Sequence, residues 1–228
     1  MSDLDLRNKT VVITGAGTPL GRVLVEHFAK TGATLVAVFD TIDEAYERFP
    51  QHLEGWVLAA DLADEAAAQS CFRKIAEKFE HLDVLIHATN EWDRRPIGQM
   101  SFEDWDRVIR KNLYAAFLSF REALYMMKTG PGRLIAITNQ QGADKARAQM
   151  GAYAAAQAGL IRLVEATAAE YAKLDIAAFA IAPSIVLTEA EGKHGVWAGD
   201  VAELCLHLCR PESKALTGSV LRTYGTVQ

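Results

Sequence analysis

The sequence is poor in cysteine and has no excess of basic residues. Three cysteines in 228 residues provide no disulfide framework, which indicates a reducing compartment. The 24 lysines and arginines are outnumbered by 29 aspartates and glutamates, and the formal net charge is -5. This balance disfavours a nucleic-acid-binding protein, because such proteins neutralise phosphates with basic side chains. We therefore expect no nucleic-acid partner.

Long apolar runs and interdomain linkers are also missing. No run approaches the roughly 20 apolar residues of a membrane-spanning helix, and the acidic segment Met1–Asp5 lacks the basic start of a signal peptide. No linker rich in proline, glycine and serine and no internal repeat divides the chain. Half of the residues are hydrophobic, which is enough for a buried core. The sequence predicts a single cytoplasmic domain over residues 1–228 without membrane contact.

Apolar runs of strand length alternate with segments of helical periodicity. The strand-like runs are Lys9–Thr14, Thr34–Phe39, Trp56–Ala60, Leu82–His87, Gly132–Thr138, Ile176–Ile181 and Val220–Tyr224. The helix-like segments are Leu20–Lys30, Asp64–Phe79, Phe102–Met127, Ala152–Tyr171 and Val201–Cys209. Continuous apolar strands separated by helices are typical of a parallel sheet covered on both faces. We predict an α/β protein, a three-layer doubly wound parallel sheet of the Rossmann type.

The turn after the first strand carries the most informative pattern. Residues 14–21 read TGAGTPLG, and small residues let the backbone approach a pyrophosphate at the positive end of the following helix. Thr18 can cap that helix, and Pro19 suits its first position. The pattern predicts a dinucleotide site that includes Gly15, Gly17, Thr18 and Gly21. The alternative is a glycine-rich turn that serves only close packing of the helix against the sheet.

An acidic residue lies where a dinucleotide site would need one. Asp40 follows the second strand, 19 positions after Gly21. A carboxylate there accepts hydrogen bonds from ribose hydroxyls and repels a 2'-phosphate. The position favours NAD over NADP.

Six ordered segments together resemble the short-chain dehydrogenase/reductase family, over Lys9–Gly225. They are Asp61-Leu62, Leu82–Ile86, Trp105–Phe117, Tyr153–Leu160, Ala182-Pro183 with Thr188, and Leu216–Leu221. The resemblance implies an oxidoreductase that uses NAD or NADP on a small-molecule substrate and assembles as a homodimer or homotetramer through its two long helices. It also implies that Asp61 and Leu62 contact the adenine, and that Pro183 and Thr188 lie over the nicotinamide.

Two turns depart from the family pattern. The middle glycine of the first turn corresponds to Pro19, which has no amide proton. The family's Asn-Asn-Ala-Gly after the fourth strand is His87-Ala88-Thr89-Asn90 here. Ala88 remains a candidate coenzyme contact in this altered turn. We interpret His87 as a hydrogen-bonded structural group, with titration near neutral pH as the alternative.

The family's four catalytic positions are only half retained. Tyr153 and Asn112 match the pattern. The serine is replaced by Asn139 or Gln140, depending on where a one-residue insertion is placed, and the lysine is replaced by Gln157. Asn112 has a structural alternative, because its side chain can satisfy a backbone carbonyl within a long helix.

The missing lysine affects the two directions of the reaction differently. In the family's mechanism the tyrosine exchanges a proton with the substrate oxygen, and the lysine lowers its pKa. An unperturbed phenol with a pKa near ~10 is ionised in about one molecule in a thousand at pH 7, which disfavours alcohol oxidation. We predict reduction of a carbonyl or imine. The alternative is a catalytically silent relative, with or without a coenzyme, that binds a nucleotide, metabolite or protein partner as a sensor or scaffold.

Two further clusters are weaker signals. Cys205 and Cys209 share a helix face while His207 points elsewhere, so we predict no metal site. The segment Glu91–Arg95 places an arginine pair beside Trp92 at the carboxyl edge of the sheet. This segment is either a solvated loop or a receptor for an anionic or aromatic ligand.

Overall fold

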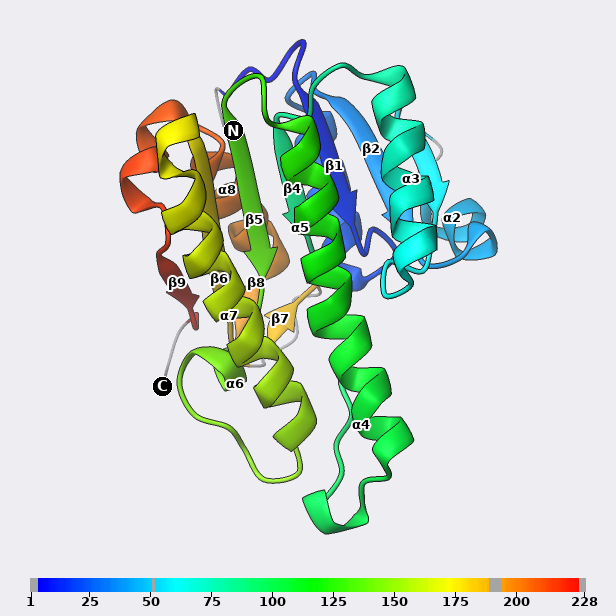
Figure 1. Ribbon diagram of the computed structural model, residues 1–228, viewed down its shortest axis with the longest axis vertical. Coiled ribbons are helices and arrows are strands. Elements are labelled where there is room, and N and C mark those ends of the chain that lie inside the picture. Colours follow the sequence, from blue (N-terminus) through cyan, green and yellow to red (C-terminus); the bar gives the residue numbers. More distant parts are fainter. Residues whose placement is uncertain (1–3, 51, 189–193, 226–228) are drawn as a thin grey trace.

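A parallel sheet of seven strands forms the centre of the computed structural model, which describes residues 4–50, 52–188 and 194–225 (Figure 1). The strands are β1 (Thr10–Thr14), β2 (Thr34–Phe39), β3 (Trp56–Ala59), β4 (Val84–His87), β5 (Gly132–Ile137), β6 (Ile176–Pro183) and β9 (Val220–Thr223). Their order is β3-β2-β1-β4-β5-β6-β9, and all neighbouring pairs are parallel. The predicted doubly wound Rossmann sheet is confirmed.

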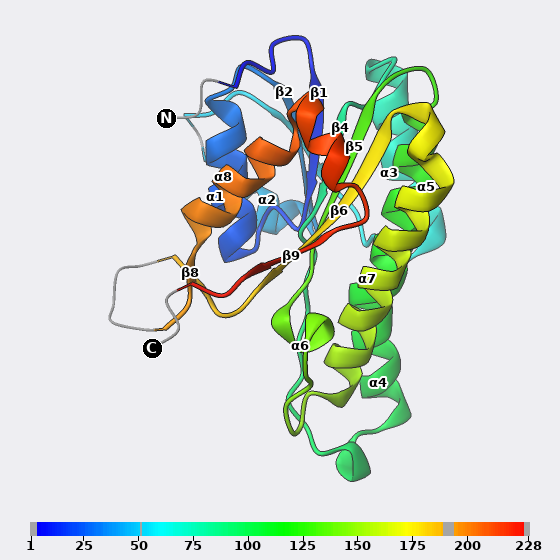
Figure 2. The ribbon, with the colours of Figure 1, turned by 90° about the vertical axis from the view of Figure 1, so that its left-hand side faces the viewer.

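Helices cover both faces of this sheet. Figure 2 shows α1 (Pro19–Ala29) and α8 (Ala198–Leu208) on one side, and α3 (Glu65–Lys78), α5 (Ala115–Met126) and α7 (Gly151–Tyr171) on the other. The remaining elements are α2 (Ile42–Arg48), α4 (Phe102–Ile109), α6 (Gln140–Ala143) and the short paired strands β7 (Val186–Leu187) and β8 (Val196–Trp197). Three 3-10 helices cover Ile97–Gln99, Ala172–Leu174 and Pro211–Leu216.

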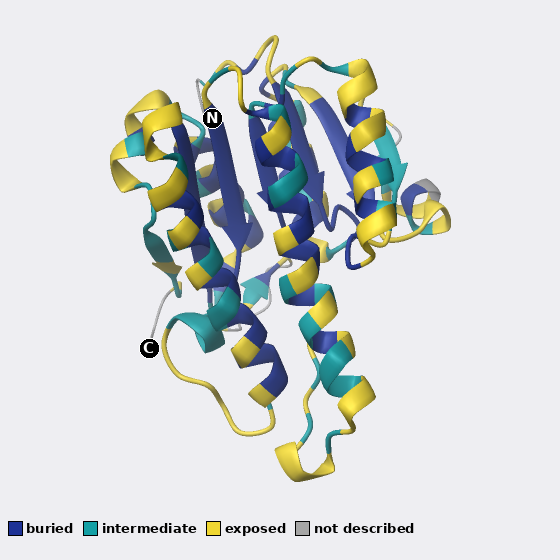
Figure 3. Cartoon of the chain, in the orientation of Figure 1, coloured by how far each residue is buried: buried dark blue, intermediate teal, exposed yellow. Residues whose placement is uncertain are grey.

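The two helix layers explain why the strands read as unbroken apolar runs. In β1, Val11 and Ile13 belong to the core beneath α1 and α8, whereas Val12 belongs to the core beneath α3, α5 and α7. Figure 3 shows the strands buried between helices whose outward faces are exposed. A strand that is buried on both faces carries apolar side chains on both, so its sequence does not alternate between apolar and polar residues. None of the helices in the described residues is both long and apolar enough to cross a membrane.

The bounds of most elements differ from the predicted ones by one to three residues, but one helix differs in kind. The predicted helix Phe102–Met127 is interrupted by a π-helical segment, Arg110–Tyr114, between α4 and α5. The side-chain amide Nδ2 of Asn112 donates to the Val108 carbonyl at 2.8 Å. Such a side-chain bond satisfies a carbonyl where the helical ladder widens. The Asn112 side chain therefore contributes to the local helix geometry, and the hydrophobic periodicity of the sequence does not detect such a polar group.

The buried end of β4 carries a histidine. The His87 side chain is fully buried, and its Nδ1 lies 3.0 Å from the Thr14 hydroxyl oxygen. Its ring meets that of Phe120 edge to face, with centroids 6.3 Å apart. Burial lowers the pKa of His87 to about 3, because a charged imidazolium loses its hydration there. The folded protein therefore holds this ring neutral across physiological pH.

The neutral state of His87 predicts a specific loss of stability in acid. Between pH 6.5 and about 3 the unfolded chain binds a proton at His87 that the folded chain does not, so stability falls as the pH falls. One proton is equivalent to at most ~1.4 kcal/mol per pH unit. In His87→Leu, the free energy of unfolding, measured with urea at pH 4.5 to 7, should decline less steeply than in the unmodified protein.

Two features make this comparison specific. Thr14 keeps a second hydrogen bond, from the Thr89 hydroxyl at 3.2 Å, so the substitution leaves no unpaired hydroxyl at that position. The exposed His207 serves as the control, since His207→Gln should keep the original pH dependence. Parallel curves for His87→Leu and the unmodified protein would exclude a buried neutral histidine as the source.

Candidate active site

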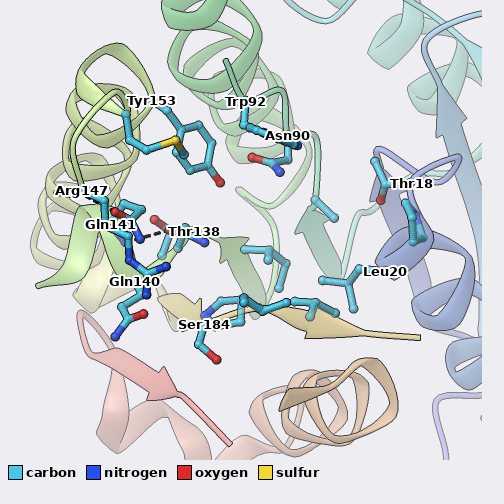
Figure 4. Close-up of a pocket in the computed structure, with 18 of the residues that line it drawn as sticks. Thr18, Leu20, Asn90, Trp92, Thr138, Gln140, Gln141, Arg147, Tyr153 and Ser184 are labelled. Atoms are coloured by element: carbon cyan, nitrogen blue, oxygen red, sulfur yellow. Dashed lines mark hydrogen bonds between the residues drawn. The ribbon is translucent and has the colours of Figure 1, made fainter. Parts of the chain in front are cut away.

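A cavity of about 640 Å³ opens at the carboxyl ends of the central strands (Figure 4). Its walls come from the turn before α1, the segment after β4, the segment from β5 to the start of α7, and the segment after β6. The lining residues are Thr18, Pro19, Leu20, Ala88, Asn90, Trp92, Arg94, Ile137, Thr138, Asn139, Gln140, Gln141, Arg147, Ala148, Met150, Tyr153, Pro183, Ser184, Ile185 and Val186. Ligand sites of doubly wound sheets lie in this position.

The turn before α1 is packed too closely for side chains at two glycines. A Cβ atom on Gly15, whose φ is +64°, would lie 2.6 Å from the Ala88 carbonyl carbon and the Thr89 nitrogen. A Cβ atom on Gly21 would lie 2.1 Å from the Gly15 oxygen. Thr18 completes the turn, because its Oγ1 accepts from Gly21 N and donates to Gly15 O, both at 2.9 Å. The packing brings the start of α1 against the end of β4.

The first turn of α1 offers few backbone donors to an anion. Pro19 has no N–H group. The N–H of Gly21 binds the Thr18 hydroxyl, and the N–H of Arg22 binds the Thr18 carbonyl at 3.0 Å. Within the described residues, the N–H of Leu20 is the one donor of this turn without a partner. Leu20 lines the cavity, so this donor and the helix dipole act at its edge.

The acidic candidates form a charged cluster with a lysine that sequence reasoning did not single out. Lys111 Nζ lies 3.0 Å from Asp61 Oδ1 and 3.7 Å from Asp40 Oδ2. Although burial raises it, the hydrogen bonds from Lys111 and the Ala63 N–H hold the pKa of Asp61 below its ordinary value. Asp40 directly follows β2 and Asp61 follows β3, so the cluster lies at the neighbouring part of the same sheet edge.

Tyr153 occupies the opposite side of the cavity from the α1 turn. Figure 4 shows its hydroxyl pointing into the cavity, with Asn90 beside it. The ring is 4% exposed and packs with Val108 and Ala152 between α4 and α7. Burial raises the pKa of the phenol, and a hydrogen bond with the Asn90 side chain only partly opposes this. Tyr153 is therefore a neutral phenol at pH 7.

Two amide side chains lie behind Tyr153 and connect three segments. Gln157 Nε2 donates to Asn112 Oδ1 at 3.1 Å and approaches Asn90 Oδ1 at 3.4 Å. Asn112 also accepts from Glu91 N at 3.2 Å and donates to Glu91 O at 2.6 Å. The network joins α7, the π-helical segment and the loop after β4. Asn112 and Gln157 lie behind the residues that line the cavity, and their hydrogen bonds hold the loop that carries Asn90.

Asn90 is a site residue that sequence reasoning missed. The signal was its place in the turn after β4, where the sequence departs from the family pattern. The two candidates for the serine position, Asn139 and Gln140, both line the cavity. Asn139 caps α6 through its Oδ1, which accepts from Gln141 N at 2.7 Å. Its NH₂ group remains as the donor for a ligand.

The remaining predicted residues divide between the cavity and its surroundings. Thr18, Ala88, Asn139, Tyr153 and Pro183 line it together. Leu62 is buried beside Asp61, and Gly17 is covered by the Glu44 side chain, which a Cβ atom would meet at 2.2 Å. Thr188 is exposed directly after β7. In the described part of the chain, no three histidine, cysteine, aspartate or glutamate residues gather as a metal site.

Known proteins resemble this chain over nearly its whole length. The family model for short chain dehydrogenases matches residues 9–198. The D-threitol dehydrogenase of Mycolicibacterium smegmatis is 29% identical over 203 residues, which cover 86% of this chain and 76% of that protein. The 3-oxoacyl-(acyl-carrier-protein) reductase of Thermotoga maritima is 27% identical, with 95% of this chain and 96% of that protein covered.

A solved structure agrees with these sequence relatives in its fold. The short chain dehydrogenase from Burkholderia cenocepacia, in complex with NADP, has a TM-score of 0.84 to this chain at 21% identity. The similarity covers 96% of this chain and 98% of that one.

The buried amide network predicts a measurable cost when Gln157 loses its polar group. Gln157 is 1% exposed, and Gln157→Met keeps its length while removing the bonds to Asn112 and Asn90. Loss of these two hydrogen bonds, each worth about 0.5–1.5 kcal/mol, should lower the free energy of unfolding by about 1–3 kcal/mol in total. Urea unfolding followed by circular dichroism measures this change. Gln69→Met on the exposed face of α3 is the matched control, with an expected change below about 0.5 kcal/mol. Equal stability of the two variants would contradict the network's role.

Proposed function

The chain belongs to the short-chain dehydrogenase family, and on that premise we propose that it is an NAD(P)-dependent reductase of a small carbonyl or imine compound, with Tyr153 as the proton donor. One observation carries the proposal. A single cavity contains the turn before α1 at one end and the Tyr153 hydroxyl at the other. A dinucleotide at the turn and a substrate at the tyrosine would therefore share one space.

The residues present suit a dinucleotide at several points. The close packing at Gly15 and Gly21 brings bare backbone to the cavity edge, where a diphosphate needs close approach. The N–H of Leu20 and the dipole of α1 are the attractive groups there. A bound nicotinamide would supply the hydride that reduces the substrate carbon.

The state of Tyr153 supports reduction over oxidation. Its phenol is neutral because burial raises the pKa and no cation takes the place of the family lysine at Gln157. A neutral phenol is ready to donate a proton, whereas alcohol oxidation requires a phenolate. Tyr153 donates to the substrate oxygen while the carbon is reduced, and water returns a proton to the phenolate. The NH₂ group of Asn139 can stabilise the developing negative charge on the same oxygen.

The charged cluster at the sheet edge bears on the choice of coenzyme. We propose that NAD is preferred to NADP, because the Asp40 carboxylate repels a 2'-phosphate. Lys111 lies 3.7 Å from that carboxylate and offsets part of the repulsion. The preference should therefore be modest, and NADP(H) belongs in every binding experiment. The NADP named for the similar Burkholderia cenocepacia structure is a second reason to include NADP(H).

We also propose that the protein assembles as a homodimer or homotetramer. Exposed aromatic residues along α4, the π-helical segment and α5 support this, since several large apolar side chains exposed along one helical stretch favour burial against a partner. They are Phe102, Tyr114, Phe117 and Tyr125.

Removing the phenolic hydroxyl should abolish turnover without abolishing coenzyme binding. Tyr153→Phe should lower kcat for ketone or imine reduction by about 10²–10⁴-fold, the usual contribution of a positioned acid. Stopped-flow oxidation of NADH or NADPH with a panel of ketones, quinones and imines measures kcat. Tyr171→Phe, at the far end of α7, is the control and should retain full activity. Unchanged turnover in Tyr153→Phe would remove the proposed acid, and failure of all four coenzyme forms to bind would favour a silent sensor or scaffold.

The proline in the first turn should limit the affinity for coenzyme. Pro19→Gly restores one backbone N–H at the start of α1, and one additional hydrogen bond to a phosphate should tighten Kd by about 2- to 10-fold. Titration of tryptophan fluorescence with NADH and with NADPH measures both affinities. Pro211→Gly, at the start of a 3-10 helix away from the cavity, should leave both Kd values unchanged. An unaltered Kd in Pro19→Gly would mean that no phosphate reaches this turn.

A further inference from the structure

The cavity is lined by positively charged side chains that have no role in the proposed reduction. Among the described residues that line it, Arg94 and Arg147 are the charged ones, and no aspartate, glutamate or lysine accompanies them. Neither guanidinium forms an ion pair with an acidic residue in the described ranges. Two exposed guanidinium groups at a cavity, with no acidic side chain beside them, give it a positive potential that attracts anions.

Neighbouring acidic residues are already neutralised by other arginines. Asp93 binds Arg107 at 2.8 Å and Arg95 at 3.3 Å. Asp104 pairs with Arg95, and Glu91 pairs with Arg107. The loop after β4 therefore uses two arginines to satisfy its own carboxylates.

Arg94 is left over from that network and lines the cavity. Of the two arginines noted in the sequence, Arg95 therefore pairs with acidic residues of the protein, and Arg94 is available to a ligand.

The acidic residue nearest to Arg147 in the sequence is also engaged elsewhere. Asp144 accepts hydrogen bonds from Arg222 Nε at 2.7 Å and from the Tyr224 hydroxyl. These bonds hold the pKa of Asp144 below its ordinary value, so it stays ionised and paired with β9. Arg147 has no such partner, and its backbone is fixed by a 2.9 Å bond from its N–H to Gln141 Oε1.

The two arginine-bearing loops are joined to each other. Arg95 N donates to Gln149 O at 2.8 Å, which ties the segment after β4 to the segment before α7. Trp92 and Met150 line the cavity from the same two loops. An organic anion entering here would meet apolar contacts together with the two guanidinium groups.

The position of Arg147 distinguishes this region from a coenzyme phosphate site. Figure 4 shows Arg147 on the same side of the cavity as Tyr153 and Gln141, with Thr18 and Leu20 on the opposite side. A diphosphate belongs at the start of α1. An anion beside Arg147 therefore belongs to the molecule that Tyr153 protonates.

We propose that the substrate is a small carbonyl compound that carries a carboxylate, held by Arg147 and Arg94 with its carbonyl group at Tyr153. The proposal rests on the proposed reductase function. The planar fork of a guanidinium matches a carboxylate, and a charge-assisted pair of this kind orients the group as well as binding it. The carboxylate is unchanged in the reaction, so Arg94 and Arg147 determine specificity and do not move protons.

Matched acids and esters test this specificity directly. We would compare 4-oxopentanoate and phenylglyoxylate with their methyl esters as substrates of the unmodified protein. The acids should have kcat/KM values at least about tenfold above the esters, as expected for one charge-assisted hydrogen bond. Arg147→Gln and Arg94→Gln should each remove most of this advantage while leaving the esters within about twofold, since screening and loss of charge affect only the anion. Arg73→Gln on the exposed face of α3 is the matched control.

A binding measurement separates this inference from the proposed function. Calorimetric titration of the coenzyme-loaded protein with benzoate and with benzyl alcohol needs no turnover. Benzoate should bind more tightly than the alcohol, and Arg147→Gln should abolish the difference.

The outcomes have distinct meanings. Reduction of esters as fast as acids, with no benzoate preference, overturns the carboxylate proposal and leaves the reductase intact. Benzoate binding that depends on Arg147, without reduction of any ketone, supports the anion site and overturns the reductase. Absence of both overturns the two proposals together.

Discussion

The contact between the backbone at Gly15 and the end of β4 is the constraint on which the rest of the site depends. No atom of a side chain fits between Gly15 and the Ala88–Thr89 peptide, so the start of α1 is held directly against the strand that leads to Asn90, Trp92 and Arg94. The proposed coenzyme end and the proposed substrate end of the cavity are therefore built from segments that touch. The glycines can serve close packing and phosphate binding at the same time. The packing that requires glycine at these positions also brings the backbone to the cavity edge.

A buried amide network lies behind Tyr153. Gln157 is hydrogen-bonded to Asn112 and Asn90, Asn112 is hydrogen-bonded to the loop at Glu91, and none of these amides carries charge. Tyr153 consequently lies in a neutral environment that favours the phenol. The positively charged side chains that line the cavity are those of Arg94 and Arg147. The same cavity thus combines the proposed proton donor with the proposed anion-binding groups.

The sequence was sufficient for the fold, because the fold follows from local signals, and several of the predicted site residues line one cavity. Continuous apolar runs such as Val11–Ile13 identify strands that are buried on both faces, and TGAGTPLG identifies the first turn. The helix Phe102–Met127 was predicted as continuous because periodicity does not register a side-chain bond such as Asn112 to Val108. Asn90 and the link from Lys111 to Asp40 depend on contacts between segments 67 to 71 positions apart, and no pattern within one segment reveals them.

The π-helical segment Arg110–Tyr114 also fixes the rotational relation between the two halves of the helix that it joins. Because a π-helical segment holds one residue more than the α-helical turn it replaces, deletion of a single residue here would let α4 and α5 join as one continuous α-helix with nearly the same rotational relation. A deletion within α4 or α5 would instead rotate one half against the other by about 100° and carry Val108 away from Tyr153. Changes of length in this part of the chain should therefore fall in the π-helical segment or in the loop before Ser101, where they preserve the helical phase.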